Sequence, residues 1–493
     1  MRKQQLSTLD IKCKLNQAGK NISLTSIHRI CNDQGFARLP KRTEKERISY
    51  LEKSSEINRM PAERSHTIDF SMDENLGNET VGVLVFLSII KEYGIDDVIK
   101  NSLYPETKDL PKLNSILAFL ALKLVKNARY SNDSMWAHNR ILGMFAGLNV
   151  LPKSTWFSTY SSATTRDQNI TFIKAINAVF KKHGLLSGVF NIDFTAIPYY
   201  GNSKTLENNW AGKYDKCLQS FQASICQDSG SGLLCYGDAT IRHENQNEVI
   251  LDFVEIYQSD GLKLDFMIFD SKFTTIKNLG NMDRQGVKFI TIQRRCKTVI
   301  TKIDAIPKDE WKTVRIQKAN DRDRIVRYAE STTTLQSYGD GDVRQIFIET
   351  KHEKPAIIIT NDKERPVTDI VRKYSLRWSV ENKISEQINF FHLNRNCSEI
   401  DIKVDFDLTM SMLANNLYRL LALKLKGYER KRPEELYENF ITGKGVVQIK
   451  NDEIEVIINR RKRLPVLLTY MKNNNLKYDW IGNKSLKFIP NSN

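Results

Sequence analysis

Two aspartates in the middle of the chain lie in or next to apolar segments, where burying a carboxylate costs free energy unless another group compensates its charge. Asp193 lies between apolar neighbours in the strand-like segment 188–195, and Asp270 ends the apolar run 266–269. A carboxylate in such a place must be hydrogen-bonded, paired or bound to a metal ion. Two Mg2+ ions held about 4 Å apart by carboxylates can activate a water or a sugar hydroxyl and stabilise the leaving oxygen of a phosphodiester. These two residues therefore predict metal-assisted phosphodiester chemistry.

A third carboxylate is expected from a helix that crosses the sheet, and Glu381 is the candidate. Tyr374, Arg377 and Glu381 stand at i, i+3 and i+7 of a helix expected from Pro366 to about Phe391, so they share one helical face. A guanidinium on that face can hold a phosphate with two hydrogen bonds while the acid completes a metal site. An amphipathic helix with an internal Arg–Glu pair is the alternative that this segment alone leaves open.

Other acids compete with Asp270 for the second position. Asp238 follows a strand-like segment, and Asp265 lies five residues before Asp270. Because strand side chains alternate between faces, an offset of five residues places Asp265 on the face opposite Asp270. We therefore prefer Asp270. His243 and Glu244 lie near the third expected strand and could assist, with a purely structural His as the alternative.

The elements around these acids predict an α/β fold. Strands are expected at 188–195, 221–226, 233–241, 264–269, 287–292 and 356–360. Three helices are expected. The first covers 247–257, the second lies between the fourth and fifth of these strands, and the third begins at Pro366. Three consecutive strands followed by alternating helices and strands are typical of a ribonuclease-H-like mixed sheet. Residues 296–354 lack the periodicity of their flanks and predict an insertion, where Trp311 could stack on a displaced base or belong to a core.

Residues 1–42 predict a small helical domain ahead of the sheet. In the second of two expected helices, Leu24, Ile27 and Cys31 fall on one face and polar side chains on the others. This pattern favours a helix-turn-helix whose polar face meets phosphates and base edges, and an ordinary helical hairpin remains the alternative. The residues expected to contact DNA here are Thr25, Ser26, His28, Arg29, Arg38, Lys41 and Arg42.

The remaining boundaries follow from charge and periodicity. We expect a mixed-charge linker at 43–65, a helical domain at 66–185, the catalytic domain at 186–395 and a mostly helical basic region at 396–493.

Composition narrows the class of partner. The 493 residues include 74 Lys and Arg against 58 Asp and Glu, a net charge of +16 that favours a polyanion such as DNA. The longest apolar run, 81–90, is half of the ~20 residues that span a bilayer, and the start of the chain lacks an apolar signal segment. We therefore expect a cytoplasmic protein without a membrane partner. The seven cysteines show neither zinc-ligand spacing nor a disulfide framework.

Three sequence blocks resemble the insertion-sequence transposases that carry an Asp-Asp-Glu triad, in the cut-and-paste group with a β-rich insertion before the Glu helix. They are FNIDFTAIPYYG around Asp193, FMIFDSKFTTIKNLGNMDRQGVKFITIQRR around Asp270, and AIIITNDKERPVTDIVRKYSLRWSVEN, which contains Tyr-x-x-Arg-x-x-x-Glu at Tyr374, Arg377 and Glu381. The intervals of 77 residues from Asp193 to Asp270 and 111 from Asp270 to Glu381 leave room for the insertion.

One position departs from this family's pattern. The motif ordinarily continues to a Lys seven residues after the Glu, and that residue is Ile388 here. Lys383 is a substitute for the missing phosphate contact if the orientation of the helix permits it.

The resemblance implies a DNA transposase of a prokaryotic cytoplasm, associated with the nucleoid when bound to DNA. Such an enzyme binds double-stranded terminal inverted repeats as a homodimer on paired ends, cleaves DNA hydrolytically with two Mg2+ ions or with Mn2+ as a substitute, and joins the 3′-hydroxyl ends to target DNA. The residues implied are Asp193, Asp270 and Glu381 for catalysis and metal, and Tyr374, Arg377 and Lys383 for DNA. A structure-selective nuclease of the same fold and a catalytically inert DNA-binding protein remain as alternatives.

Overall fold

The computed structural model describes residues 20–33 and 75–491, together with residues 8, 11, 12 and 15. Short gaps lie at 109, 204, 213–214, 260, 274, 294–296, 318–322, 340, 351–352, 396–397 and 473. No helix within these described ranges has the length and apolar character needed to cross a bilayer.

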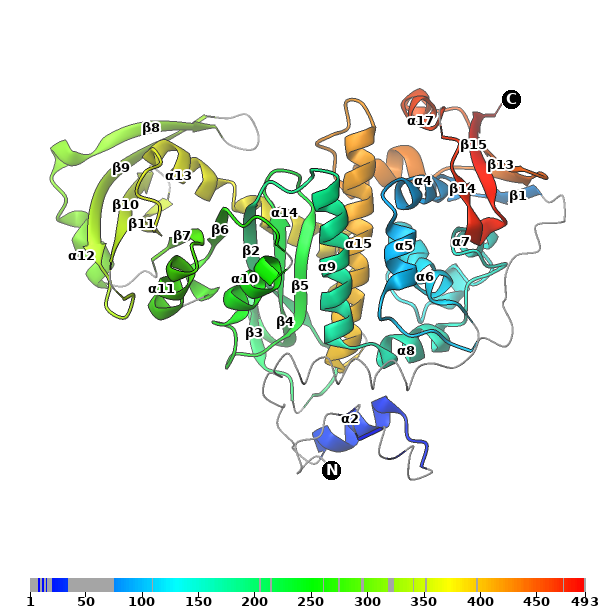
Figure 1. The fold of residues 1–493 in the computed structure, drawn as a ribbon, viewed down its shortest axis with the longest axis horizontal. Coiled ribbons are helices and arrows are strands. Elements are labelled where there is room, and N and C mark those ends of the chain that lie inside the picture. The colour runs from blue at the N-terminus through cyan, green and yellow to red at the C-terminus, as the bar shows by residue number, and fades with distance from the viewer. Residues whose placement is uncertain are drawn as a thin grey trace.

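A mixed sheet of ten strands forms the largest layer of the described chain (Figure 1). Its first six strands in sequence are β2 (Val189–Pro198), β3 (Asn208–Ala211), β4 (Lys216–Asp228), β5 (Leu234–Ile241), β6 (Phe266–Phe269) and β7 (Lys288–Ile292). The order across the sheet is β3-β4-β2-β6-β7-β11-β10-β9-β8, and β5 also pairs with β4. β2, β6 and β7 run parallel to one another, whereas β4 is antiparallel to β2, β3 and β5. The expected ribonuclease-H-like mixed sheet is confirmed.

The segment expected as an insertion lengthens this sheet. Its elements are α12 (Lys297–Asp304), η6 (Lys308–Glu310), β8 (Lys312–Gln317), β9 (Asp323–Thr334) and β10 (Asp342–Thr350), followed by β11 (Glu353–Thr360). β8 to β11 form an antiparallel meander, and β11 pairs antiparallel with β7. In Figure 1 these strands form the end of the molecule farthest from the C-terminus.

Helices cover both faces of the sheet. The elements involved are α10 (Val249–Ser259), η5 (Ser271–Phe273), α11 (Ile276–Arg284), α13 (Val367–Ser375), α14 (Trp378–Asn389) and α15 (Asp401–Lys424). On one face the ring of Phe190 packs edge-on against Phe253 and Tyr257 of α10. On the other face, Val380 and Ile384 of α14 share an apolar cluster with Ile197 of β2. The sheet is therefore the middle layer of three.

The helix expected to run unbroken from Pro366 to about Phe391 is two helices. Backbone bonds from Arg377 to the carbonyl of Tyr374, 3.0 Å, and from Ser379 to that of Leu376, 2.9 Å, replace the i to i−4 pattern between α13 and α14. The side chain of Asn191 lies 3.1 Å from Ser379 Oγ, which in turn donates to Gln227 Oε1 at 2.9 Å. These contacts fix the start of α14 against β2 and β4, so a tertiary contact accompanies the break.

The regions on either side of the sheet share one core. The elements before the sheet are β1 (Asn75–Asn78), η2 (Val81–Leu84), α4 (Val85–Glu92), α5 (Ile95–Asn101), α6 (Lys112–Leu124), η3 (Asp133–Met135), α7 (Arg140–Phe145), α8 (Ser154–Ala163) and α9 (Arg166–Lys182). Those after α15 are α16 (Pro433–Leu436), η7 (Tyr437–Ile441), β12 (Gly445–Ile449), β13 (Glu453–Ile458), α17 (Leu464–Met471), β14 (Lys477–Tyr478), η8 (Asp479–Ile481) and β15 (Lys484–Pro490). A five-stranded sheet, ordered β1-β12-β13-β15-β14, joins the two regions. The C-terminal region expected to be mostly helical thus ends in a sheet that takes its first strand from residues 75–78.

α15 is the central spine of this arrangement. It lies between the ten-stranded sheet and the helices of the N-terminal half (Figure 1), and it is buried on nearly every side. It approaches β5 so closely that a Cβ added to Gly237 would lie 2.2 Å from Sδ of Met412. α15 therefore lies in the interior of the protein, and its buried residues include the polar Asp405, Asn415 and Asn416 as well as apolar side chains.

Candidate active site

Asp193, in the middle of β2, lies beside Asp270, which directly follows the last residue of the parallel strand β6. Ile192 of β2 is in register with Phe269 of β6, and each aspartate is the next residue along the chain. Residues at the same register position of adjacent strands point to the same face of the sheet. The two carboxylates that were predicted from isolated segments are therefore neighbours on one face of the sheet at the point where β6 ends, here called the sheet edge.

Burial and neighbouring charges perturb Asp193. Burial raises the pKa of Asp193 from 3.8 to about 6, and the negative charges of Glu381 and Asp270 add to this effect. The guanidinium of Arg377 and the N–H of Phe194 oppose it, since both stabilise the charged carboxylate. The charges of Asp270 and Glu381 therefore lie close enough to act on the carboxylate of Asp193.

Arg377 occupies the space between two of these acids. Its Nη1 lies 3.0 Å from Asp193 Oδ2, and its Nη2 lies 2.9 Å from Glu381 Oε1. The residue is 7% exposed, and its Nε has no hydrogen-bond partner among the described residues. Arg377 precedes the first residue of α14, and Glu381 stands in the first turn of that helix. The break between α13 and α14 thus sets the position of this guanidinium over the sheet edge.

Tyr374 completes the group from the last turn of α13. The guanidinium of Arg377 lies 5.7 Å from the centre of its ring. Burial raises the pKa of the Tyr374 phenol to about 12, so the hydroxyl remains a neutral hydrogen-bond donor at physiological pH. The structure therefore brings together Tyr374, Arg377, Glu381, Asp193 and Asp270, although the two helices are not continuous.

The acids have the donor chemistry of a magnesium site but are not gathered as ligands. Carboxylate oxygens are the ligands that hard divalent cations prefer, and Asp193, Asp270 and Glu381 offer three such groups. Within the described part of the chain, however, no three His, Cys, Asp or Glu side chains are arranged so that they could hold a metal ion. Glu381, with 49% of its side chain exposed, is directed to Arg377. The three carboxylates are suitable ligands for Mg2+, but the guanidinium of Arg377 occupies the space between Asp193 and Glu381.

Lys383 does not take the place of the family's missing lysine at this site. Its ammonium lies 2.7 Å from Glu386 Oε2, and that oxygen also accepts a bond of 2.9 Å from Asn415. The Lys383 and Glu386 side chains are only 12% and 9% exposed. Ile388, at the family's lysine position, packs against an apolar cluster. The orientation of α14 therefore directs Lys383 into a buried ion pair, and its expected role in binding DNA has no support in this geometry.

The competing acids have other partners. Asp238 accepts two bonds from Arg166, 2.9 and 2.6 Å, and two from Thr240. Asp265 is paired with Lys263 at 2.8 Å. Each is neutralised away from the Asp193 edge, so the preference for Asp270 stands as the interpretation that this geometry supports.

Two further alternatives lie apart from these acids. His243 is engaged with Asn209, 2.8 Å from ring nitrogen to amide oxygen, as expected of a structural histidine. Trp311 is half-buried against the small cluster that packs α12 on β11, and the guanidinium of Arg327 lies 5.1 Å from its ring.

The N-terminal helix α2 (Leu24–Asp33) has the two faces that its sequence predicts. Leu24, Ile27 and Cys31 are buried, and Ile11 joins the cluster formed by the last two. Of the residues expected to contact DNA, Thr25 and Arg29 are exposed, while Ser26 and His28 are half-buried. Ser26 bonds to Ser23, and His28 lies 3.2 Å from Oγ1 of Thr8. Arg38, Lys41 and Arg42 lie outside the described residues.

Sequence reasoning missed the polar relay that anchors α14. Asn191 is fully buried two residues before Asp193, and it reaches Ser379 and, through it, Gln227. The available signal was an amide two residues from an acid in an otherwise apolar strand. Because strand side chains alternate, Asn191 had to share the face of Asp193.

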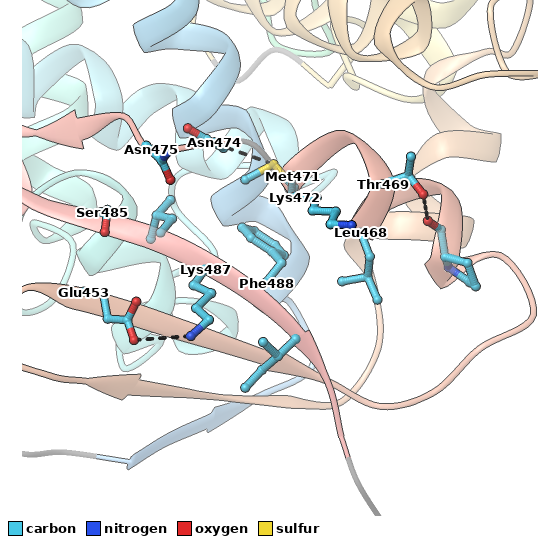
Figure 2. Close-up of a pocket in the computed structure, with 13 residues that line it drawn as sticks. Glu453, Leu468, Thr469, Met471, Lys472, Asn474, Asn475, Ser485, Lys487 and Phe488 are labelled. Carbon is cyan, nitrogen blue, oxygen red and sulfur yellow. Dashed lines mark hydrogen bonds and ion pairs between the residues drawn. The ribbon is translucent and has the colours of Figure 1, made fainter.

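The C-terminal region carries a groove of about 600 Å3 between α17 and β15 (Figure 2). Leu468 and Met471 of α17 line it together with Phe488 of β15, and Lys487 pairs with Glu453 on its floor at 3.6 Å. None of the three candidate acids contributes to it, so the groove is separate from the proposed chemistry at the sheet edge.

Comparison with known proteins gives one family match and one solved structure. The family model described as the transposase DDE domain matches residues 186–417. The piggyBac transposase, solved as a synaptic complex with hairpin DNA, aligns over 73% of this chain and 78% of its own at 12% identity and a TM-score of 0.38. No curated protein matches the chain. The mixed sheet has the ribonuclease-H-like order, and the family match covers it: the chain contains a transposase DDE domain at residues 186–417. The resemblance to transposases is confirmed.

Proposed function

We propose that this protein is a DNA transposase that binds the ends of its element, cleaves them by metal-dependent hydrolysis and joins the 3′-hydroxyl ends to target DNA. The observation that carries the proposal is that Asp193 and Asp270 each follow the registered pair Ile192 and Phe269, with Glu381 linked to Asp193 through Arg377. The match to the transposase DDE domain over the same residues supports it.

Each side chain has a role in this proposal. Asp193, Asp270 and Glu381 hold the divalent cations, two Mg2+ ions in our proposal, with Mn2+ as a substitute. When bound, the cations supply activation of the attacking oxygen and stabilisation of the leaving oxygen. Arg377 holds a phosphate of the DNA end, because its guanidinium offers a fork of donors and its Nε has no partner among the described residues. Tyr374 donates from its neutral hydroxyl to the same backbone.

The larger assembly is also a proposal. The +16 net charge favours double-stranded DNA as the partner, both as terminal repeats and as target. Strand transfer of two ends requires both to be held at once, which favours a homodimer. We further propose that residues 1–42 recognise the ends, 66–185 form a helical domain, 186–395 form the catalytic domain and 396–493 add a basic region.

A single substitution tests the chemistry. Glu381→Gln keeps the shape of the side chain but removes the charge that a cation needs, so we expect end binding to remain and nicking to be lost. The assay uses a supercoiled plasmid that carries both element ends, with Mg2+, and scores nicked, excised and joined products on gels. Asp369→Asn is the matched control, because Asp369 is a half-exposed acid on α13 that pairs with Arg372 at 3.4 Å. Normal nicking by Glu381→Gln would remove Glu381 from the site, and cleavage without joining by the native protein would indicate a nuclease.

A further inference from the structure

Arg377 is the only described cation that bridges the acids proposed as metal ligands. Its two Nη atoms reach Asp193 and Glu381, at 3.0 and 2.9 Å. With 7% of its surface exposed, the residue is enclosed by the strands and helices that carry these acids. A guanidinium in this position neutralises two carboxylates that would otherwise repel each other.

The contacts of Asp193 leave little room for a second cation. Its Oδ2 accepts from Arg377, and its Oδ1 accepts from the N–H of Phe194 at 2.8 Å. Both oxygens are therefore engaged. A divalent ion that binds Asp193 and Glu381 together must replace the guanidinium, because two cations in a partly buried site a few ångströms apart repel strongly.

A buried guanidinium that leaves its carboxylates needs another anion, since an unpaired buried charge is destabilising. A DNA phosphate is the anion that the proposed function brings to this edge. Arg377 can bind it with the two Nη donors once these are released and with Nε, which has no partner among the described residues.

We infer that Arg377 is a stand-in for the metal cation in the DNA-free protein. It holds Asp193 and Glu381 together, keeps the affinity for divalent ions low, and moves to a phosphate when an end is bound. Metal loading and end binding then promote each other, as any such coupling must be reciprocal. The inference rests on the proposed function, because it takes these acids as the metal ligands, and it adds a device that limits cleavage to protein already on DNA.

The test is a titration of the DNA-free, full-length protein with Mn2+, followed by the electron paramagnetic resonance signal of the free ion. Arg377→Gln removes the competing charge, so we expect its tightest Mn2+ site to bind at least about tenfold more strongly than that of the native protein. Arg377→Lys retains a charge that can meet only one carboxylate at a time, so we expect a smaller increase. Arg372→Gln is the matched control, because Arg372 is exposed on α13 and pairs with Asp369 at 3.4 Å. It should bind Mn2+ as the native protein does.

The double variant Arg377→Gln with Glu381→Gln locates the new affinity. If the ion binds between the acids, the second substitution abolishes the gain. A gain that survives it places the ion elsewhere and overturns the inference. Urea unfolding of each variant shows whether it is folded, and if Arg377→Gln is not, Arg377→Lys decides the question.

The result also separates this inference from the proposed function. If Arg377→Gln and Arg377→Lys, both folded, bind Mn2+ no more tightly than the native protein, Arg377 does not compete with metal. The proposed function still stands in that case if the native protein cleaves element ends with Mn2+. If saturating Mn2+ gives no cleavage of element ends, the proposed function fails, whatever the titration shows.

Discussion

Arg377 and Lys383 are cations six residues apart, yet they lie in different surroundings. Arg377 joins two acids at the sheet edge, whereas Lys383 is buried with Glu386 and Asn415. Helical geometry accounts for the difference, because six residues turn an α-helix through about 600°, which leaves the two side chains about 120° apart around the helix axis. The DNA contact predicted for Lys383 ignored this angle.

Lys383 is therefore expected to matter for stability. Lys383→Met leaves Glu386 buried without its ammonium, which costs about 3 kcal/mol or more of unfolding free energy. The double variant Lys383→Met with Glu386→Gln removes both charges and keeps an acceptor for Asn415, so it should recover most of the loss. Urea unfolding measures both values. The affinity of the folded Lys383→Met protein for DNA, and its dependence on salt, should match the native values, and a reduced salt dependence would return Lys383 to the DNA interface.

The site residues differ in how far the sequence could specify them. Asp193 and Asp270 were predicted because a carboxylate in or next to an apolar strand needs a compensating partner, and this signal is visible within one short segment. The pairing of Ile192 with Phe269 joins segments that are 77 residues apart, and the periodicity of either segment does not predict it. Asn191 was missed for the same reason, since its partner Ser379 is 188 residues away.

At the level of elements, the expected helices and strands of the central sheet are present, and the failures are tertiary. The residues around the break between α13 and α14, 374–378, include neither Gly nor Pro, so nothing local predicts a break there. The anchoring of Ser379 by Asn191 lies beyond the reach of a single-segment pattern. The small C-terminal sheet was missed because its first strand, β1, comes from residues 75–78.

Close packing between α11 and the turn after β9 gives an element-scale prediction. A Cβ added to Gly280 of α11 would lie 1.8 Å from the backbone oxygen of Tyr338, which cannot rotate away as a side chain can. Gly280→Ala should therefore separate the two segments and cost roughly 2 kcal/mol or more of unfolding free energy. Hydrogen exchange in β9 and β10 should accelerate. Gly77→Ala is the control, because no heavy atom of the described residues lies within 4 Å of its added Cβ. Equal destabilisation of the two variants would show that the close approach is not the cause.

At the scale of the whole molecule, a buried polar chain ties the N-terminal helices to the sheet and to α15. Tyr104 donates to Asn169 of α9 at 2.8 Å, and Asn169 donates to Asp405 of α15 at 2.7 Å. Asp405 also accepts from the N–H of Ala239 in β5 at 2.8 Å. Three parts of the chain thus meet at one carboxylate that is 1% exposed.

This carboxylate predicts a dependence of stability on pH. Burial, followed by the charge of Asp238, raises the pKa of Asp405 from 3.8 to about 7. A raised folded-state pKa means that the neutral form is favoured in the folded protein, so the stabilisation is complete below pH 3.8 and is lost as the pH rises to about 7. Asp405→Asn is neutral at every pH, so its stability relative to the native protein should increase on the order of 3 kcal/mol from pH 4 to pH 8. Urea unfolding across this range measures the difference, and Asp369→Asn should show none. A flat profile for Asp405→Asn would mean that Asp405 is charged in the fold.

The distribution of charge over the molecule gives the last prediction. Residues 1–42 contain nine Lys and Arg against two Asp, so they carry a net charge of +7 of the +16 in the whole chain. If the polar face of α2 and the basic residues after it bind phosphates, deletion of 1–42 should lower the slope of log affinity against log salt by about 0.9 for each phosphate that these residues neutralise. It should also abolish the preference for element ends over random duplex, because base readout by α2 is removed, while nonspecific binding by the rest of the chain remains.

Replacing Arg38, Lys41 and Arg42 with Ala is the comparison for this deletion. It removes charge and leaves α2 intact, so affinity should fall while end preference persists. Both are measured by competition binding at several salt concentrations. If the deletion keeps its end preference, recognition belongs to the helical or C-terminal region, and the role predicted for α2 is wrong.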